Sequence, residues 1–286
     1  MTEFSRIAVL GPGILGGSLA LAFQKRHPDS HVSLWGRNPE RIAEIVATGF
    51  EHATDNLSLA IRDSELVILA VPVGALEDLG KQVLHAGVNP DALVTDLGSV
   101  KSYPHESLGA LLNRSGISFI GSHPMAGSER SGFAAADADL FEGAPCIITN
   151  ENRESADEIG RLTSFWKSLG AETTVMSAEE HDRIVGRISH LPHILSSLCA
   201  LTALDDVTDG RFAGKGLRDT SRVAAGDPQM WLEILMENRL QISSPVRDAS
   251  KMLEHIADAL ERRDETAILS ALVEAREKRH TLDQIN

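Results

Sequence analysis

Residues 6–16 read Arg6-Ile7-Ala8-Val9-Leu10-Gly11-Pro12-Gly13-Ile14-Leu15-Gly16. The apolar run before Gly11 is typical of a buried strand, and helical periodicity follows from Leu15 to Gln24. A G-x-G-x-x-G sequence between a strand and a helix has a specific mechanical meaning. Its first glycine permits a tight turn, its second lets the backbone approach a pyrophosphate, and its third lets the helix pack closely on the strand.

The amide groups and the dipole at such a helix start bind phosphates. The turn therefore predicts a dinucleotide site that contains Gly11, Gly13, Ile14, Leu15 and Gly16. Ligands of open α/β sheets bind at the carboxyl ends of the strands. For that reason we expect the same nucleotide to contact Val71 and Pro72, which end a later strand candidate.

Short β-rich runs alternate with helical segments through the first part of the chain. They lie at residues 31–35, 66–71, 93–95, 119–121, 145–149 and 172–175. Such alternation predicts a mostly parallel sheet. From Ala178 onward only helical periodicity is found. The sequence thus predicts an α/β fold with a Rossmann-type domain over residues 1–177 and an all-α domain over residues 178–286. Apolar stripes on the long helices of the second domain predict a homodimer.

Composition excludes several classes of protein. The 286 residues are 42% hydrophobic and 24% charged, which is usual for a globular protein. Lys and Arg total 27 and Asp and Glu total 41, so the net charge is −14, which disfavours nucleic-acid binding. The longest apolar stretch, residues 66–76, is about half the length of a membrane span. With no basic-then-apolar leader and only Cys146 and Cys199, the sequence predicts a cytoplasmic protein that does not bind membranes.

The end of the second strand candidate bears on the choice of nucleotide. NAD sites usually carry Asp or Glu there to bind the ribose 2′-hydroxyl, whereas this chain has Arg37 and, one turn later, Arg41. Guanidinium groups suit a 2′-phosphate, so the sequence favours NADP over NAD. The alternative is that both arginines are solvated residues of a helix start.

Two segments that follow strand candidates carry polar side chains. Ser99 follows the strand at 93–95 and either presents a hydroxyl to a ligand or caps a helix. His123 follows the strand at 119–121 and has the pKa range of a general base. The alternative for His123 is a structural histidine held by Pro124.

The helical half carries the other candidates. On a regular helix Arg183, Arg187 and His190 would share one face, and Pro192 predicts a bend before His193. The pair His190-x-x-His193 has no convincing third ligand, so no metal site is predicted. Farther along, Arg218 and Arg222 offer guanidinium groups for a carboxylate, or form a surface loop.

Together these segments resemble the prephenate/arogenate dehydrogenases of tyrosine biosynthesis. The matching segments, in order, are the glycine turn, Asp96–Lys101, Ser122–Glu129, Ser189–His193 and Arg218–Arg222. The resemblance covers nearly the whole chain. It implies oxidative decarboxylation of prephenate, a small dicarboxylate, to 4-hydroxyphenylpyruvate with hydride transfer to NAD(P)⁺, and dimerisation through the helical domain.

The resemblance also implies roles for individual residues. His123 matches the catalytic histidine, assisted by Ser99 and His190. The substrate-binding positions are matched by Arg222, His193, Arg218, Ser122 and Glu129. A histidine at position 193 is typical of enzymes that use prephenate, which favours that substrate over arogenate.

Other functions remain open at this stage. Arogenate dehydrogenase is the nearest alternative. β-Hydroxyacid dehydrogenases and imine reductases also join a Rossmann domain to a helical one, but they usually carry a catalytic lysine in the helical half, and residues 178–200 contain none. A catalytically silent, NADP-sensing protein would keep the glycine turn without assembling His123, Ser99 and Arg222.

Overall fold

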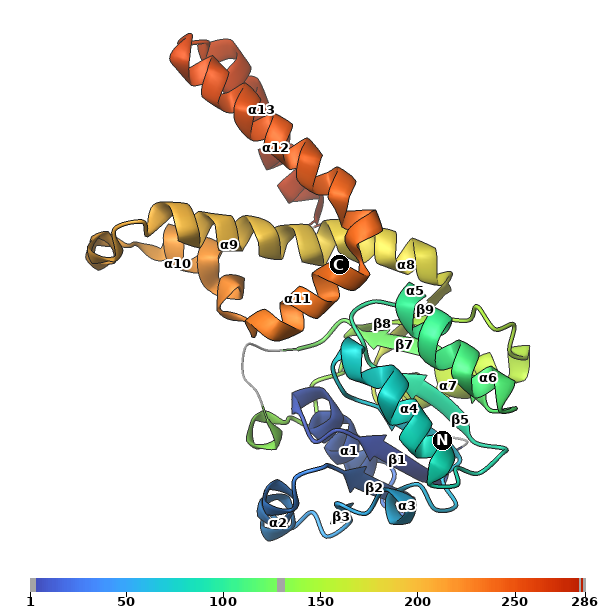
Figure 1. Cartoon of the computed structure of the whole chain (residues 1–286). Coiled ribbons are helices and arrows are strands. Elements are labelled where there is room, and N and C mark those ends of the chain that lie inside the picture. The colour runs from blue at the N-terminus through green and yellow to red at the C-terminus, as the bar shows by residue number, and fades with distance from the viewer. Residues whose placement is uncertain (1–3, 128–131, 283, 285–286) are drawn as a thin grey trace. The chain divides into compact units, whose positions relative to one another are not determined.

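The computed structural model describes residues 4–127, 132–282 and 284. Its larger sheet is entirely parallel and has the strand order β3-β2-β1-β4-β5-β6 (Figure 1). These strands are β1 (Arg6–Leu10), β2 (His31–Trp35), β3 (Ala53–Thr54), β4 (Leu66–Leu69), β5 (Leu93–Asp96) and β6 (Ser118–Phe119). In this doubly wound order the chain reverses its direction of travel between β1 and β4, which is where such sheets bind ligands.

Both faces of the larger sheet are buried. Ile7 and Val9 of β1 belong to one apolar core, whereas the alternating residues Ala8 and Leu10 belong to another. The first core is covered by α1 (Ile14–Arg26) and α7 (Ala156–Ser168), and the second by α4 (Leu76–His85) and α6 (Ala110–Arg114). Continuous apolar strands are therefore needed, and β4 is buried along its whole length.

A second sheet carries the histidine that the sequence singled out. It contains β7 (Gly121–Pro124), β8 (Pro145–Thr149) and β9 (Glu172–Met176), with β7 antiparallel and β9 parallel to β8. The sequence predicted one strand at 119–121, but the chain changes sheets at Ile120, whose amide still bonds to the Val94 carbonyl of the first sheet. His123 consequently lies within a strand and not after one.

Helices alone follow Met176 in the described residues. Helix α8 (Ala178–Val185) continues through a π-helical turn, Gly186–His190, into α9 (Leu191–Ala203). The prediction that Arg183, Arg187 and His190 share a face is wrong, because both arginines are exposed and His190 is buried. The wide turn before Pro192 changes the angular register, so the α-helical spacing does not apply across it.

The other helices have the following bounds: α2 (Pro39–Ala47), α3 (Leu57–Ala60), α5 (Ser102–Pro104), α10 (Lys215–Ser221), α11 (Pro228–Glu237), α12 (Arg239–Glu261) and α13 (Glu265–Leu282). By its contacts the chain divides into two compact units, Met1–Arg239 and Leu240–Asn286. The second unit consists mainly of α12 and α13. The predicted α/β class, with a mostly parallel N-terminal sheet and a helical C-terminal half, is confirmed.

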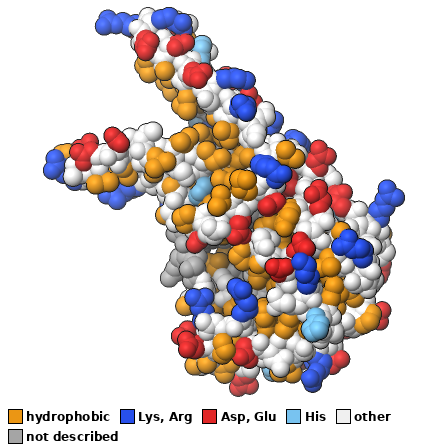
Figure 2. Space-filling view, viewed as in Figure 1, with side chains coloured by type: hydrophobic (Ala, Val, Ile, Leu, Met, Phe, Trp, Pro, Cys, Tyr) orange, Lys and Arg blue, Asp and Glu red, His pale blue; other side chains and the backbone are white. Residues whose placement is uncertain are grey.

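Apolar side chains are exposed on the helices that follow residue 177. Those on α9 include Leu195, Leu198 and Leu201, and Figure 2 shows hydrophobic side chains gathered at the surface of this part of the chain. Among the described residues, Ala178–Ala203 is the one helical stretch long and apolar enough to cross a membrane by length and composition alone. A single stretch of this kind is weak evidence for a membrane span, since packed helices meet the same criterion.

Candidate active site

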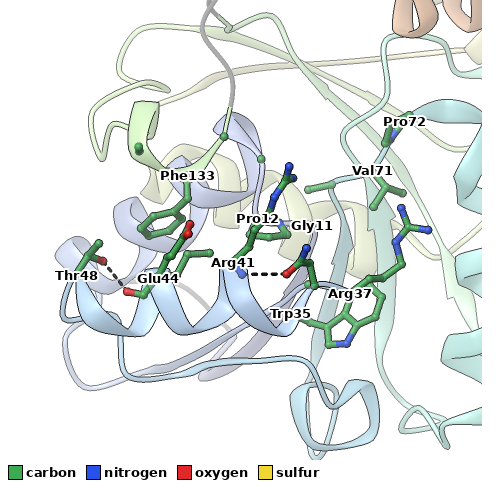
Figure 3. Close-up of a pocket in the computed structure, with 17 residues that line it drawn as sticks. Gly11, Pro12, Trp35, Arg37, Arg41, Glu44, Thr48, Val71, Pro72 and Phe133 are labelled. Atoms are coloured by element: carbon green, nitrogen blue, oxygen red, sulfur yellow. Dashed lines mark hydrogen bonds between the residues drawn. The ribbon is translucent and has the colours of Figure 1, made fainter.

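A cavity of about 670 Å³ opens where β1, β2 and β4 end. Three loops from these strands supply most of its lining. They contribute Gly11, Pro12 and Gly13 after β1, Gly36, Arg37 and Asn38 after β2, and Ala70, Val71 and Pro72 after β4. The cavity therefore occupies the point where the strand order reverses (Figure 3).

The glycines of this turn meet the requirements of a phosphate site. Gly11 has a φ of 125°, and a Cβ atom there would collide with the carbonyl oxygen of Ala70. A Cβ atom on Gly16 would collide with the carbonyl oxygen of Gly11, whereas Gly13 has no atom within 4 Å of that position. The first turn of α1 has no side-chain cap and no carboxylate. An anionic pyrophosphate thus fits this helix start.

Two guanidinium groups line the cavity beside the end of β2. Arg37 and Arg41 are both exposed and both face the cavity (Figure 3). Their loop is fixed by Asn38, whose Oδ1 accepts hydrogen bonds from the backbone of Glu40 at 2.9 Å and Arg41 at 3.1 Å. The sequence analysis missed Glu44, which also lines the cavity and lies three residues after Arg41 on α2. Its helical spacing from Arg41 was the available signal.

The predicted nucleotide residues divide into two groups. Those that line the cavity are Gly11, Gly13, Arg37, Arg41, Val71 and Pro72. Ile14, Leu15 and Gly16 do not line it; they begin α1, where Gly16 permits the helix to approach β4 closely. Phe133, from the segment after the described gap, is a further lining residue that carried no sequence signal.

His123 lies at the centre of a buried polar cluster. Its Nδ1 is 2.8 Å from Nε2 of His181, and Nδ1 of His181 is 2.8 Å from Oδ1 of Asp182. The Asp182 carboxylate also accepts hydrogen bonds from the backbone amides of Lys101 at 2.7 Å and Ser102 at 2.9 Å. The sequence analysis did not identify His181 or Asp182, which are brought to β7 by the packing of α8.

A buried ion pair adjoins this cluster. Lys101 and Asp96 are bonded to each other, and neither is accessible to solvent. Burial, followed by the charges of His181, Lys101 and His190, holds the pKa of His123 well below its usual value. His123 is therefore neutral at physiological pH, which a general base must be.

The two histidines of α9 and the preceding π turn share one aromatic neighbour. Trp231 stacks on His193 at 3.5 Å between ring centroids and meets His190 edge-on at 6.1 Å. Nδ1 of His190 is 2.9 Å from the side-chain amide nitrogen of Asn238, which also donates to the backbone carbonyl of Asp182. Burial lowers the pKa of His190 to about 4, so this ring is neutral.

The remaining predicted site residues have different surroundings. Ser99 is half-buried in the loop after β5. Its backbone lies close enough to the His190 ring to oppose the lowering of the His190 pKa by burial. Ser122 is fully buried, and its hydroxyl bonds to Thr95 at 2.7 Å and Trp166 at 3.0 Å. The substrate-binding role that the resemblance implied for this serine stays a prediction.

The arginines of the rear half are exposed. Arg218 lies on α10, and Arg222 begins the 3₁₀ turn Arg222–Ala225, which packs on α9. Burial lowers the pKa of His193, and a hydrogen bond with the backbone of the next residue, Val223, opposes that change. The 3₁₀ turn therefore lies beside His193. Glu129 lies outside the described residues. Within the described ranges, no group of three or more His, Cys, Asp or Glu side chains is arranged to hold a metal.

Family models match both halves of the chain. Residues 19–175 match a model described as "Prephenate dehydrogenase, nucleotide-binding domain". Residues 177–274 match one described as "Prephenate dehydrogenase, dimerization domain". The matched regions follow one another in the order that the sequence predicted.

Individual proteins agree with these matches. The chain is 32% identical over 283 residues to a prephenate dehydrogenase of Lactococcus lactis subsp. cremoris, covering 97% of this chain and 77% of the relative. It is 30% identical to a cyclohexadienyl dehydrogenase of Zymomonas mobilis, covering 91% of this chain and 95% of that protein. A structure of Aquifex aeolicus prephenate dehydrogenase with hydroxyphenyl propionate and NAD⁺ matches with a TM-score of 0.86 and 27% identity, over 99% of this chain and 98% of that one.

Proposed function

The chain belongs to the prephenate dehydrogenase family, and from that membership we propose that it oxidises and decarboxylates prephenate to 4-hydroxyphenylpyruvate. The single observation that carries the proposal is a neutral, buried His123 on β7, a strand that contacts β5 of the sheet whose β1, β2 and β4 loops line the nucleotide cavity. Because both halves of the chain match this family, we prefer this function to that of a β-hydroxyacid dehydrogenase or an imine reductase. A silent NADP sensor has no need of such a base.

The base and the cavity are connected through the strands. Beyond Pro72 the sheet continues to β5, where the Leu97 amide bonds to the Leu69 carbonyl. Strand β7 lies against β5, and the Thr95 and Ser122 hydroxyls bond across them at 2.7 Å. Because side chains of a strand alternate, His123 lies on the face opposite Ser122. In this proposal the substrate binds beyond Pro72, next to the end of β5, where the His123 side chain can contact it.

His123 takes the proton from the C4 hydroxyl of prephenate at its imidazole nitrogen. A nicotinamide dinucleotide held by Gly11, Gly13 and Val71 would supply the acceptor for the hydride of C4. As the carbonyl forms at C4, the C–C bond to the ring carboxylate breaks and CO₂ departs. The electron pair of that bond completes the aromatic ring, and the C4 oxygen takes the proton back from His123 to give the phenol. Ser99 orients the C4 hydroxyl, and His190 supports the same polar contact.

Arg222, in this proposal, binds a substrate carboxylate through its planar guanidinium group. Arg218 adds positive charge nearby, and His193, held flat against Trp231, contacts the substrate. Glu129 is proposed as polar support for the same pocket. These positive groups make a local site for a dicarboxylate in a chain of net charge −14.

We propose NADP as the preferred nucleotide, because Arg37 and Arg41 both line the cavity. The A. aeolicus structure carries NAD⁺, so the assay below compares both nucleotides. We also propose residues 1–177 as the nucleotide domain and residues 178–286 as the substrate and dimerisation domain. The exposed leucines of α9 support a homodimer. The protein is proposed to act in the cytoplasm without membrane or nucleic-acid partners.

One assay tests both the substrate and the cofactor. Prephenate and arogenate are each mixed with the enzyme and either NAD⁺ or NADP⁺, and the reduced nicotinamide is followed by absorbance. We expect turnover with prephenate, at a lower KM for NADP⁺ than for NAD⁺. A higher kcat/KM for arogenate than for prephenate would identify the chain as an arogenate dehydrogenase. We include arogenate because the chain also matches a cyclohexadienyl dehydrogenase. Turnover with neither substrate refutes the proposed function.

A further inference from the structure

Three buried side chains form a line that ends at the proposed base. His123 contacts His181, and His181 contacts Asp182, each across 2.8 Å. His123 is 8% exposed, Asp182 is 2% exposed and His181 is fully buried. We propose that Asp182 and His181 are positioning residues that hold His123 in the tautomer with hydrogen on Nδ1, so that Nε2 carries the lone pair that receives the substrate proton. The inference rests on the proposed role of His123 as the base.

The direction of each hydrogen bond follows from Asp182. Its two carboxylate oxygens accept the backbone N–H groups of Lys101 and Ser102, which can only donate. Burial alone would raise the pKa of Asp182, but hydrogen bonds from His181 and Ser102 lower it below its usual value. Asp182 is therefore ionised and acts only as an acceptor, so Nδ1 of His181 must donate to it.

The same reasoning carries through to His123. A neutral histidine has one N–H group, so when Nδ1 of His181 donates, its Nε2 can only accept. Nδ1 of His123 then donates to His181, and Nε2 of His123 is left with its lone pair. In the described part of the chain no hydrogen bond occupies Nε2 of His123. The atom that the reaction requires is thus the one that the hydrogen-bond directions leave available.

Burial keeps both rings neutral before reaction, and several titratable groups also face the pair. Those facing it are Lys101, Asp96, Asp182 and His190. Burial lowers the pKa of His181, although its bond to Asp182 opposes that change. When His123 gains a proton, its positive charge lies one imidazole away from the Asp182 carboxylate. Asp182 thereby stabilises the protonated base without receiving a proton itself, as the carboxylate of a serine-protease triad does.

A purely structural role for these residues is the competing explanation. Asp182 accepts the backbone amides at the start of α5, so its loss would disturb that helix whatever the tautomer of His123. For this reason the test changes His181 and leaves Asp182 intact. His181→Leu removes the acceptor for His123, whereas the amide of His181→Gln can both accept from His123 and donate to Asp182.

His105→Gln is the matched control. His105 is a buried histidine of the same region, and its ring contacts Thr149 rather than the line of three. We expect His181→Leu to lower kcat about 10- to 100-fold with KM for prephenate within about twofold. His181→Gln should recover most of that loss, and His105→Gln should keep wild-type kcat per folded enzyme.

Nuclear magnetic resonance reads the tautomer directly. In protein labelled with ¹⁵N-histidine, the two ring nitrogens of His123 are assigned by the signals that disappear in His123→Asn. We expect a protonated Nδ1 and an unprotonated Nε2 in the wild type and in His181→Gln, and a mixed or reversed pattern in His181→Leu. A simple loss of packing does not change a tautomer.

Specific results would overturn the proposal. They are an unprotonated Nδ1 in the wild type, an unchanged His123 tautomer in His181→Leu, or equal losses of kcat in His181→Leu and the control. The spectra do not depend on turnover. If the wild type oxidises neither prephenate nor arogenate but shows the expected tautomer, then the proposed function fails and the positioning role of His181 stands.

Discussion

Replacing Arg37 by Asp should convert the nucleotide preference of this enzyme. Arg37 is exposed at the mouth of the cavity and follows β2, where NAD enzymes usually carry a carboxylate. Arg37→Asp removes the proposed guanidinium partner of the 2′-phosphate and places an acceptor where the 2′-hydroxyl of NAD is expected. Arg41, one turn later, is left as the remaining positive group on that side of the cavity.

The exposure of Arg37 decides how large a change in KM for NADP⁺ to expect. A charge-assisted hydrogen bond contributes about 1.5–3 kcal/mol, which corresponds to about 10- to 150-fold in affinity. Arg37 is exposed, and solvent and salt screen its interaction, so the lower end of that range applies. KM for NADP⁺ should therefore rise about 10-fold or more, whereas KM for NAD⁺ should fall or stay constant.

Steady-state kinetics with saturating prephenate and varied nucleotide measure both KM values. Arg114→Ala serves as the control, because Arg114 is an exposed arginine at the end of α6 that does not line the cavity. The effect on NADP⁺ should weaken at high ionic strength, since it is electrostatic. If KM for NADP⁺ changes less than twofold in Arg37→Asp, the assignment of the 2′-phosphate to this arginine is refuted.

Three further outcomes can be measured. His123→Asn should lower kcat about 10²- to 10⁴-fold with nearly normal affinity for nucleotide, and unchanged turnover would remove this residue from the mechanism. Arg222→Ala should cost about 1.5–3 kcal/mol, seen mainly as a higher KM for prephenate, and a KM within twofold of wild type would argue against a carboxylate contact. Burial, the largest cause, lowers the pKa of both His105 and His190 to about 4. Unfolded histidine titrates near 6.5, so the stability that these neutral rings contribute is complete above pH 6.5 and is lost between pH 6.5 and 4, by about 3 kcal/mol each. The midpoint of thermal unfolding should fall across that interval, and a constant midpoint would contradict this account.

Local signals in the sequence were reliable guides to local structure. The glycine turn predicted the strand, the bend and the helix start, because each glycine is required by a contact within a short stretch. Asp227 followed by Pro228 is likewise a local pattern typical of a helix start, and the Asp227 side chain accepts the amide of Met230 at 2.8 Å. A helix cap of this kind involves only residues that are neighbours in the sequence, so it can be predicted from the sequence.

Features that depend on distant packing were not predictable. His181 meets His123 across 58 positions in the sequence, and no local pattern marks either partner for the other. The prediction assumed regular α-helical spacing across Gly186–His190, where the chain forms a π turn, so the inward direction of His190 was missed. The apolar run around Ile120 fits a strand in either sheet, and only the pairing of β7 with β8 decides between them.

The passage between the two sheets at Ile120 has a consequence for natural variation in this enzyme. A single residue joins β6 to β7, so this connection has no spare length to absorb an insertion or a deletion. One added residue would shift the register of β7 by one position, so the side chains of Ser122 and His123 would exchange faces of the sheet. The imidazole would then point toward Trp166 while the glycine turn after β1 remained intact. Active relatives should therefore differ in sequence here but keep the same chain length.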